Sequence, residues 1–337
     1  MNKLEEARKI IDECDQIIKD AFLKRMETLS LVVDYKIKNN LQVLDAKREK
    51  EIINQKEKEL AGNEFKQDYL DLFDEILIIS KNYQERQIPK KFALIGDNLK
   101  HSYSKIVHEF VFKNNDIKAR YDLNEISYDK LEHFFKEDIY SYNGINITAP
   151  FKEEVLKYLD EVDESAKLLK NCNTIKVINN KLIGYNTDYY GFLALLNYYN
   201  IDYSNKKCYI LGTGGAAKTV YNCLKEKALL VKLVSRSKSG ENIITYQELE
   251  EADIDILINA TPVGMNELKG FNPFIKKKVD VAIDLIYNPK RTKFLEFNNS
   301  SFNGLPMLVF QALKADEIWY NQTLKLDYEK LEGELSE

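Results

Sequence analysis

The sequence has few of the residues on which disulfide and metal chemistry depend. Its 337 residues include three histidines and four cysteines, and the cysteines show no CxxC spacing. Disulfides and cysteine-based zinc sites are therefore not expected. Three histidines are also too few for most histidine-rich metal sites, so we expect any chemistry to run without a metal. The four cysteines are Cys14, Cys172, Cys208 and Cys223.

Long apolar runs and basic blocks are missing as well. No apolar stretch approaches the roughly 18 residues that a membrane span needs, and the opening residues MNKLEEARK lack the apolar core of a signal peptide. The net charge is −5 and basic residues do not alternate with aromatic ones, which argues against a nucleic-acid footprint. These absences predict a cytoplasmic protein that binds neither nucleic acid nor a membrane. The length predicts two or three domains of ~100 to 200 residues each.

Glycine and proline are nearly absent from the first quarter of the chain. Residues 1–86 contain one glycine, Gly62, and no proline, so they are predicted to be helical almost throughout. From Phe92 onward, short apolar runs such as FALIG, CYILG and VKLVS alternate with helical patterns. That alternation is typical of parallel α/β architecture.

The first predicted helix carries charges on a face that should be apolar. Positions 11, 15, 18, 22, 25, 29, 32 and 36 alternate spacings of four and three, which defines one buried seam. Asp15, Arg25 and Lys36 interrupt that seam, and a buried charge needs a partner or a ligand. Arg25 and Lys36 fall within ~20° of each other, whereas Arg8 lies ~100° around the helix from Arg25. We expect Arg8 to reach a different neighbour, such as another subunit.

The next two helices add more polar groups. The second is predicted to start after Asp45 as its N-cap, with Arg48 and Glu49 in its first turn. The third has a stripe that turns polar toward its end, and we expect the charges to converge on a pocket suited to a small dianion. For any single charge, a solvated i,i+4 pair is the alternative. The stripe consists of Tyr69, Phe73, Ile76, Ser80 and Gln84.

Five short segments in this region carry a resemblance to a known family. RKIIDECD, KRM, DYKIKNN, DAKRE and SKNYQ follow one another as in the all-helical chorismate mutases, which residues 3–86 resemble. The resemblance implies a long first helix, an intertwined dimer and a shared site. In that site Arg25, Arg48 and the partner subunit's Arg8 would bind carboxylates, Lys36 and Gln84 the ether oxygen, and Glu49 the ring hydroxyl. Asp45 and Ser80 would lie at the pocket's edge.

The residue types suit the rearrangement that this family catalyses. A pericyclic reaction transfers no protons, so catalysis needs a preorganised shape and donors aimed at the breaking C–O bond. The alternative is that the helices form only a dimerisation or regulatory module that binds an effector without turnover. Loss of chorismate on adding the protein would distinguish the two.

The segment KKCYILGTGGAAKTVYNCL predicts a strand, a glycine turn and a helix. It contains the G-x-G-x-x-A motif of dinucleotide-binding turns, and a second apolar strand follows it. Sites that prefer NAD have an acidic residue about 20 residues further on, whereas this chain has basic and hydroxyl residues there. We therefore expect NADP, with solvated turn charges as the alternative. The cofactor residues predicted are Gly212, Gly214, Gly215, Ala216, Ala217, Ser235, Arg236 and Ser237.

Four polar clusters lie outside the nucleotide-binding unit. In GINITAPFKEE, Asn146 and Thr148 share one face of a strand, and the turn at Pro150 brings Lys152 toward the same space. The other clusters are HSYSK, NCNTI and GYNTDYYGF. Each alone is most simply a turn. Together with NATPVGM, DLIYNP and GLPMLVFQA, they make residues 92 to about 325 resemble shikimate dehydrogenase.

This second resemblance implies a role for each polar group. Ser102 and Ser104 would bind the substrate carboxylate, while Lys152 and Asp188 would flank the carbon that takes hydride. A lysine oriented by a carboxylate is a reasonable proton donor to the oxygen of a ketone that is being reduced. Thr148, Asn173 and Gln311 would hold the ring hydroxyls or the carboxylate rim, and Met265, Tyr287 and Gly304 would line the nicotinamide side.

The sequence thus predicts a fused enzyme: an all-α chorismate mutase domain followed by an α/β, NADP-dependent shikimate dehydrogenase. We expect a helical domain at residues 1–88, a shikimate-binding α/β domain at 89–192 plus 305–337, and a Rossmann domain at 193–304. The substrates would be 3-dehydroshikimate and chorismate, and the helical domain would form a homodimer. A dehydrogenase that prefers quinate and NAD is a further alternative.

Overall fold

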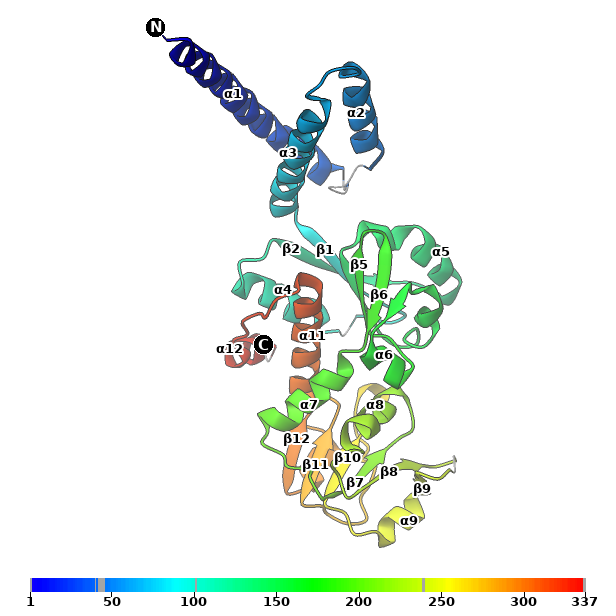
Figure 1. The fold of residues 1–337 in the computed structure, drawn as a ribbon. Helices are drawn as coiled ribbons and strands as arrows, with labels where there is room; N and C mark the ends of the chain where they lie inside the picture. The colour runs from blue at the N-terminus through cyan, green and yellow to red at the C-terminus, as the bar shows by residue number, and fades with distance from the viewer. Residues whose placement is uncertain (1, 40, 42–45, 101, 238–239, 336–337) are drawn as a thin grey trace. The chain divides into compact units, whose positions relative to one another are not determined.

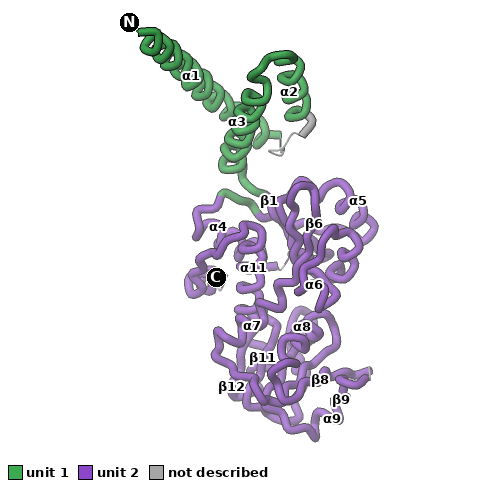
Figure 2. Tube along the Cα trace, in the orientation of Figure 1, with its two compact units in different colours: residues 1–90, 118–120 green, residues 91–117, 121–337 purple. Residues whose placement is uncertain are grey.

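The chain forms two compact units in a computed structural model, which describes residues 2–39, 41, 46–100, 102–237 and 240–335. One unit comprises residues 1–90 with 118–120, and the other comprises residues 91–117 with 121–337 (Figure 2). The first is helical and the second is α/β, which confirms the predicted fold class. Among the described residues, no helix is both long enough and apolar enough to cross a membrane.

The helical unit is built on one long helix, α1 (Lys3–Lys38). A capping box fixes its start, because Asn2 Oδ1 accepts from Leu4 N at 3.0 Å and Asn2 N donates to Glu5 Oε2 at 2.9 Å. Two further helices follow, α2 (Ala46–Glu59) and α3 (Lys66–Gln87). Arg48 and Glu49 lie in the first turn of α2 as predicted, whereas the expected N-cap, Asp45, lies outside the described residues.

The predicted seam of α1 is covered over only part of its length. Within one chain, Ile11, Asp15, Ile18 and Val32 are exposed, and the other seam positions are half-buried. The expectation of a continuous buried seam is therefore wrong for a single chain. The reason is length: at 1.5 Å per residue α1 is about 54 Å long and α3 about 33 Å. The half-buried positions are Phe22, Arg25, Leu29 and Lys36.

The first sheet of the α/β unit has the order β2-β1-β3-β5-β6-β4. β1 pairs with β3 in parallel, but β3–β5 and β5–β6 are antiparallel, so this sheet is mixed rather than purely parallel. The β5–β6 turn has Asn179 and Asn180 at φ 50° and 57°, the left-handed conformation of a tight hairpin. The strands are β1 (Lys90–Gly96), β2 (Ala119–Glu125), β3 (Gly144–Ile147), β4 (Glu161–Val162), β5 (Thr174–Ile178) and β6 (Lys181–Tyr185).

Helices cover both faces of this sheet (Figure 1). On one face Ile95 and Ile145 pack with Phe134 and Phe135 of α5. On the other, Phe92 stacks on Trp319 of α11, with ring centroids 4.4 Å apart. The helices are α4 (Ser104–Asn114), α5 (Leu131–Lys136), α6 (Glu164–Leu169), α11 (Leu305–Tyr320) and α12 (Tyr328–Glu334). Short 3₁₀ helices lie at Tyr128–Lys130, Asp138–Ser141, Glu154–Tyr158 and Asn266–Leu268.

The second sheet is the parallel, doubly wound sheet that the glycine motif predicts. Its order is β12-β11-β10-β7-β8-β9, and all of its paired strands run parallel. The order reverses between β7 and β10, where such sheets bind ligands at the carboxyl ends of their strands. The strands are β7 (Lys207–Leu211), β8 (Leu230–Ser235), β9 (Ile243–Thr245), β10 (Ile256–Asn259), β11 (Val281–Asp284) and β12 (Ser300–Asn303). The helices are α7 (Asp188–Tyr198), α8 (Gly215–Leu224), α9 (Tyr246–Glu251) and α10 (Lys293–Phe297).

Candidate active sites

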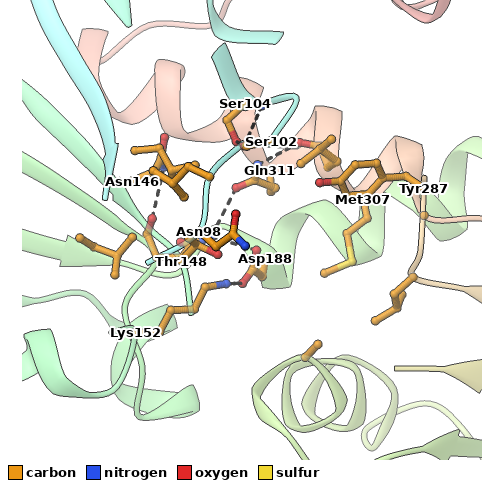
Figure 3. Close-up of a pocket in the computed structure, with 18 of the residues that line it drawn as sticks. Asn98, Ser102, Ser104, Asn146, Thr148, Lys152, Asp188, Tyr287, Met307 and Gln311 are labelled. Carbon is orange, nitrogen blue, oxygen red and sulfur yellow. Dashed lines mark hydrogen bonds and ion pairs between the residues drawn. The ribbon is translucent and has the colours of Figure 1, made fainter. Parts of the chain in front are cut away.

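The α/β unit contains a cavity of about 500 Å³. Its lining combines apolar walls with polar side chains that come mostly from loops and helices (Figure 3), the composition of a site for a small polar ligand. Twelve lining residues are among those predicted from the sequence: Ser102, Ser104, Asn146, Thr148, Lys152, Asn173, Asp188, Ala216, Met265, Tyr287, Gly304 and Gln311.

Lys152 and Asp188 form the ion pair expected at the reacting carbon. Lys152 Nζ donates to Asp188 Oδ2 at 2.6 Å, and the two side chains remain 30% and 16% exposed, so a ligand in the cavity can reach them. Asn173 Nδ2 donates to the other carboxylate oxygen at 2.9 Å. Asp188 also begins α7, whose N-terminal dipole favours a negative charge. The carboxylate is thus held on both oxygens, and it fixes the direction of the ammonium.

Gln311 reaches this cluster because α7 and α11 pack closely. Asn173 Nδ2 and Thr187 Oγ1 lie 3.4 and 3.3 Å from Gln311 Oε1. A Cβ on Gly191 of α7 would lie 2.7 Å from Met307 O and 2.8 Å from Gln311 Cβ. The missing side chain therefore lets the two helices approach, and that approach brings Gln311 to the cavity.

The predicted serine pair stands at the start of α4. Ser102 Oγ donates to Ser104 Oγ at 3.1 Å and also accepts from Ser104 N at 3.2 Å. Both hydroxyls line the cavity at the positive end of a helix. Hydroxyl donors at a helix N-terminus suit a carboxylate.

Asn146 and Thr148 both line the cavity, as their shared strand face predicts. Asn146 is 5% exposed and its amide is fully engaged: Oδ1 accepts from Tyr121 Oη at 2.7 Å, and Nδ2 donates to Thr174 Oγ1 at 2.9 Å. Asn146 therefore supports the wall of the cavity, and Thr148 has no such bonds among the described residues.

The glycine turn has the geometry that a pyrophosphate needs. Gly212 has φ +108°, a conformation that favours glycine, and it follows β7 directly. No atom lies within 4 Å of the place where a Cβ would stand on Gly214 or Gly215, so the backbone at the start of α8 is open to a ligand. Ala217 is fully buried against the sheet, so its part in the motif is to pack the helix.

The residues expected to read the 2′-phosphate follow the end of β8. Ser235 is buried and its Oγ accepts from Ser237 N at 3.2 Å, while Arg236 is exposed. This turn brings two serine hydroxyls and a guanidinium next to the strand that precedes the glycine turn, since β8 pairs with β7. The residues present fit NADP.

A buried carboxyl ties together two loops that line the cavity. Asp284, at the end of β11, accepts from Asn259 Nδ2 at 3.0 Å, from Thr292 Oγ1 at 2.5 Å and from Ile286 N at 3.1 Å. Burial raises the pKa of Asp284 from its ordinary 3.8 to about 6, and the Thr292 hydrogen bond opposes that shift. The network fixes the segments that carry Met265 and Tyr287.

In the helical unit, Arg25, Ser80 and Gln84 come together. Arg25 Nη1 donates to Ser80 Oγ, and burial lowers the pKa of the guanidinium. No carboxylate among the described residues forms an ion pair with Arg25. Gln84 is 9% exposed, and its Oε1 has no hydrogen-bond partner there either. A half-buried cation without a carboxylate partner suits an anionic ligand, and an unsatisfied amide oxygen can accept a hydrogen bond from a ligand hydroxyl.

The remaining predicted residues of this unit are spread out. Lys36 is half-buried near the end of α1, and Arg48 and Glu49 lie on α2. Arg8 is exposed, and along the helix axis it is about 25 Å from Arg25. Arg8 therefore cannot join Arg25 at one ligand within the same chain.

Comparisons with known proteins agree with this geometry. Residues 94–175 match the family model described as shikimate dehydrogenase substrate binding domain, and residues 7–85 match that of chorismate mutase type II. The shikimate dehydrogenase (NADP(+)) of Clostridium beijerinckii is 38% identical over 259 residues, which cover 72% of this chain and 95% of that protein. The chain belongs to the shikimate dehydrogenase family.

Solved structures extend the likeness. A crystal structure of a chorismate mutase/shikimate 5-dehydrogenase fusion protein from Clostridium acetobutylicum is 36% identical with a TM-score of 0.67, covering 73% of this chain and 95% of that one. The shikimate 5-dehydrogenase of Thermus thermophilus, solved with NADP(H) and shikimate, is 28% identical with a TM-score of 0.65; the match covers 70% of this chain and 95% of that one.

The dehydrogenase cavity also has lining residues that the sequence did not single out. Asn98, Asn266 and Met307 line it. Met307 lies one helical turn before Gln311, so the period of α11 could have indicated it. Asn98 lies in an irregular segment and Asn266 begins a single 3₁₀ turn, and neither is long enough for spacing to give such a signal.

Proposed function

We propose that the protein is a bifunctional enzyme that reduces 3-dehydroshikimate to shikimate with NADPH and rearranges chorismate to prephenate. The observation that carries the first activity is the Lys152–Asp188 pair, which lies in a cavity with two serines at one helix start and amides opposite. The observation that carries the second is the half-buried Arg25 beside Ser80 and Gln84.

Each polar group of the dehydrogenase cavity has a place on a cyclic hydroxy acid. Ser102 and Ser104 hold the carboxylate through their hydroxyls, helped by the dipole of α4. Thr148, Asn173 and Gln311 hold the ring hydroxyls. Several weak, directional contacts fix one orientation of the ring, and only that orientation places the carbonyl at Lys152.

Lys152 is the proposed proton donor. Reduction builds negative charge on the carbonyl oxygen, which the Lys152 ammonium stabilises and then protonates. Asp188 accepts from Lys152 Nζ at 2.6 Å and keeps it aimed at that oxygen. In the reverse direction, the neutral amine accepts the hydroxyl proton. Asp188 acts by orientation, since Asn173 already holds its second oxygen.

NADPH, when bound, supplies the hydride for this reduction. Gly212, Gly214 and Gly215 let the backbone approach its pyrophosphate at the start of α8, and Ala216 lies at the cavity. Ser235, Arg236 and Ser237 meet the 2′-phosphate. Met265, Tyr287 and Gly304 form the cavity wall on the nicotinamide side and exclude water there.

The mutase site uses fixed donors and no proton transfer. Arg25 and Arg48 bind the carboxylates, Lys36 and Gln84 face the ether oxygen, and Glu49 takes the ring hydroxyl. Ser80 lies at the edge, and Asp45, expected beside it, lies outside the described residues. The unsatisfied Oε1 of buried Gln84 supports a polar ligand at this place. The partner subunit's Arg8 completes the site. The length of α1 supports this assignment, because Arg8 is too far from Arg25 to reach the same ligand within one chain.

The same proposal includes a homodimer through the helical unit. The first half of α1 exposes many large apolar side chains, more than an isolated helix in water would keep without a partner. α3 is shorter than α1 and cannot cover the whole stripe, whereas α1 of a second copy has the length to do so. The exposed residues of the first half are Leu4, Ile10, Ile11, Ile17 and Ile18, and Leu23, Leu31, Val32, Tyr35 and Ile37 are exposed in the second half.

We also propose the domain boundaries expected from the sequence. Residues 1–88 form the mutase, 89–192 with 305–337 the shikimate-binding domain, and 193–304 the NADP-binding domain. The boundary between compact units near residue 90 and the two separate sheets support it. The cytoplasm is the proposed location, because the reaction draws on the cytoplasmic supply of NADPH.

Two assays on the purified chain test the proposal. NADPH absorbance should fall on adding 3-dehydroshikimate, and chorismate absorbance should fall without any cofactor. Faster turnover with quinate and NAD would replace the first assignment. Tight binding of chorismate without its conversion would make the helical unit an effector-binding module.

A further inference from the structure

Two buried ionisable side chains lie behind the dehydrogenase cavity and have no part in the chemistry above. His108 on α4 and Asp316 on α11 have no exposed surface, and His108 Nδ1 lies 2.7 Å from Asp316 Oδ1. His108 comes one helical turn after Ser104, and Asp316 comes five residues after Gln311. The pair therefore joins the two helices that present Ser104 and Gln311 to the cavity.

The pair also contacts the sheet. The His108 ring stacks on Tyr121 of β2, with centroids 4.1 Å apart and planes 11° from parallel. Tyr121 Oη donates to Asn146 Oδ1 at 2.7 Å, and Asn146 Nδ2 donates to Thr174 Oγ1 at 2.9 Å. Asn146 lines the cavity. A continuous path of contacts thus runs from Asp316 to the cavity wall.

Stability alone does not explain this arrangement. Burial raises the pKa of Asp316 to about 6, although His108 opposes the shift. His108 Nε2 and Asp316 Oδ2 are buried with no hydrogen-bond partner among the described residues. Apolar residues of similar size commonly stabilise a core as well as or better than such a pair. What the pair adds is a directional link between α4 and α11.

We propose that His108 and Asp316 are positioning residues of the dehydrogenase site. Their contact fixes the spacing of α4 and α11, and so the distance between the serine pair and Gln311, which hold different parts of the cyclic acid. This inference rests on the proposed dehydrogenase function. Neither residue lines the cavity.

Asp316→Ala should separate substrate binding from chemistry. The KM for 3-dehydroshikimate should rise roughly tenfold, the size of one lost hydrogen bond. The kcat should stay within about threefold, because neither residue contacts Lys152 or Asp188. The KM for NADPH should not change. Asp316→Asn, which keeps an acceptor for His108 Nδ1, should recover most of the loss.

A milder variant and a matched control guard against a general folding defect. Tyr121→Phe keeps the stacked ring and removes the hydroxyl that donates to Asn146, so it should raise the same KM by less. Asn298→Ala removes another buried amide, which accepts from Val279 N at 3.0 Å and donates to Phe294 O at 2.8 Å. It should lower Tm without changing the KM for 3-dehydroshikimate. An unchanged KM in Asp316→Ala and Tyr121→Phe, or equal losses for both substrates, would overturn the proposal.

Hydrogen exchange distinguishes failure of this proposal from failure of the proposed function. In the ligand-free protein, amides of residues 105–110 in α4 should exchange faster in Asp316→Ala than in Asn298→Ala. If Asp316→Ala does not fold, Tyr121→Phe, which breaks the same path at its next contact, supplies the comparison. A wild-type chain without reductase activity would refute the dehydrogenase, and the exchange rates would still report on the link. Unaltered exchange in α4 would refute the positioning role.

Discussion

Lys152 and Asp188 meet in a cavity whose lining comes from residues 94–311 of one chain, whereas the charged seam of α1 is covered over only part of its length. In the α/β unit, Gly191 of α7 lets α11 approach α7, and the serine pair lies at the start of α4. One chain therefore supplies all of these residues of the ligand site. In the helical unit, Arg8 is about 25 Å from Arg25 along one rigid helix. In the proposed homodimer, one helix would therefore supply two site residues that only a second copy brings together.

Lys152→Ala should have the largest effect and should be confined to the dehydrogenase. Removing the proton donor should lower kcat by about 10³-fold, the middle of the range for general acid–base groups. Shikimate affinity should stay nearly intact, and mutase activity in the same preparation is the internal control. A loss below about tenfold would refute the role of Lys152.

Lys36→Ala is the corresponding change in the helical unit. It should lower the rate of chorismate conversion by about 10²- to 10³-fold, because a fixed donor facing the breaking C–O bond is lost. Reduction of 3-dehydroshikimate by the same protein should not change. Unaltered chorismate conversion would contradict the placement of the mutase site.

The stability of the α/β unit should depend on pH through the buried carboxyl of Asp284. Asp284 has a folded-state pKa raised from 3.8 to about 6, so its stabilising contribution is present at low pH and is lost as pH rises through about 6. Relative to Asp284→Asn, the wild type should lose up to about 3 kcal/mol of unfolding free energy between about pH 4 and pH 7.

Denaturant unfolding of both proteins at pH 5 and pH 7.5 measures this difference. More than about 1 kcal/mol of relative change is expected over that interval. If the unfolding free energies of wild type and Asp284→Asn change equally with pH, the pKa of Asp284 is not raised in the folded protein.

Gly191→Ala should have the smallest effect on activity and tests how one chain closes its own cavity. The added methyl would lie 2.7 Å from Met307 O, so α7 and α11 must separate. We expect kcat/KM for 3-dehydroshikimate to fall roughly tenfold with a loss of about 1 to 3 kcal/mol in stability. Gly270→Ala, where a Cβ would meet no atom within 4 Å, is the control. Equal activity of both variants would contradict the close-packing account.

The sequence predicted those parts of the fold and sites whose signals are local. The glycine turn predicted β7 and α8, and the shared face of Asn146 and Thr148 predicted two residues of one cavity wall. The antiparallel β5–β6 hairpin was missed, although its Asn179–Asn180 turn was a local signal.

Contacts between distant segments could not be predicted in this way. His108 and Asp316 are 208 residues apart, and no periodicity relates them. The first half of α1 is exposed because α3 is shorter than α1, and the helical repeat alone does not reveal that difference. The residues that sequence patterns did not predict are therefore those whose positions depend on packing between distant segments.

Mixing variant chains tests the central claim, that one chain completes the dehydrogenase site and two chains complete the mutase site. An Arg8→Ala chain and an Arg25→Ala chain, unfolded and refolded together, should regain about a quarter of wild-type mutase activity, since half of the dimers are mixed and each has one intact site. A Lys152→Ala chain mixed with an Asp188→Ala chain should regain no dehydrogenase activity. No mutase rescue in verified mixed dimers, or dehydrogenase rescue in the second mixture, would contradict the account.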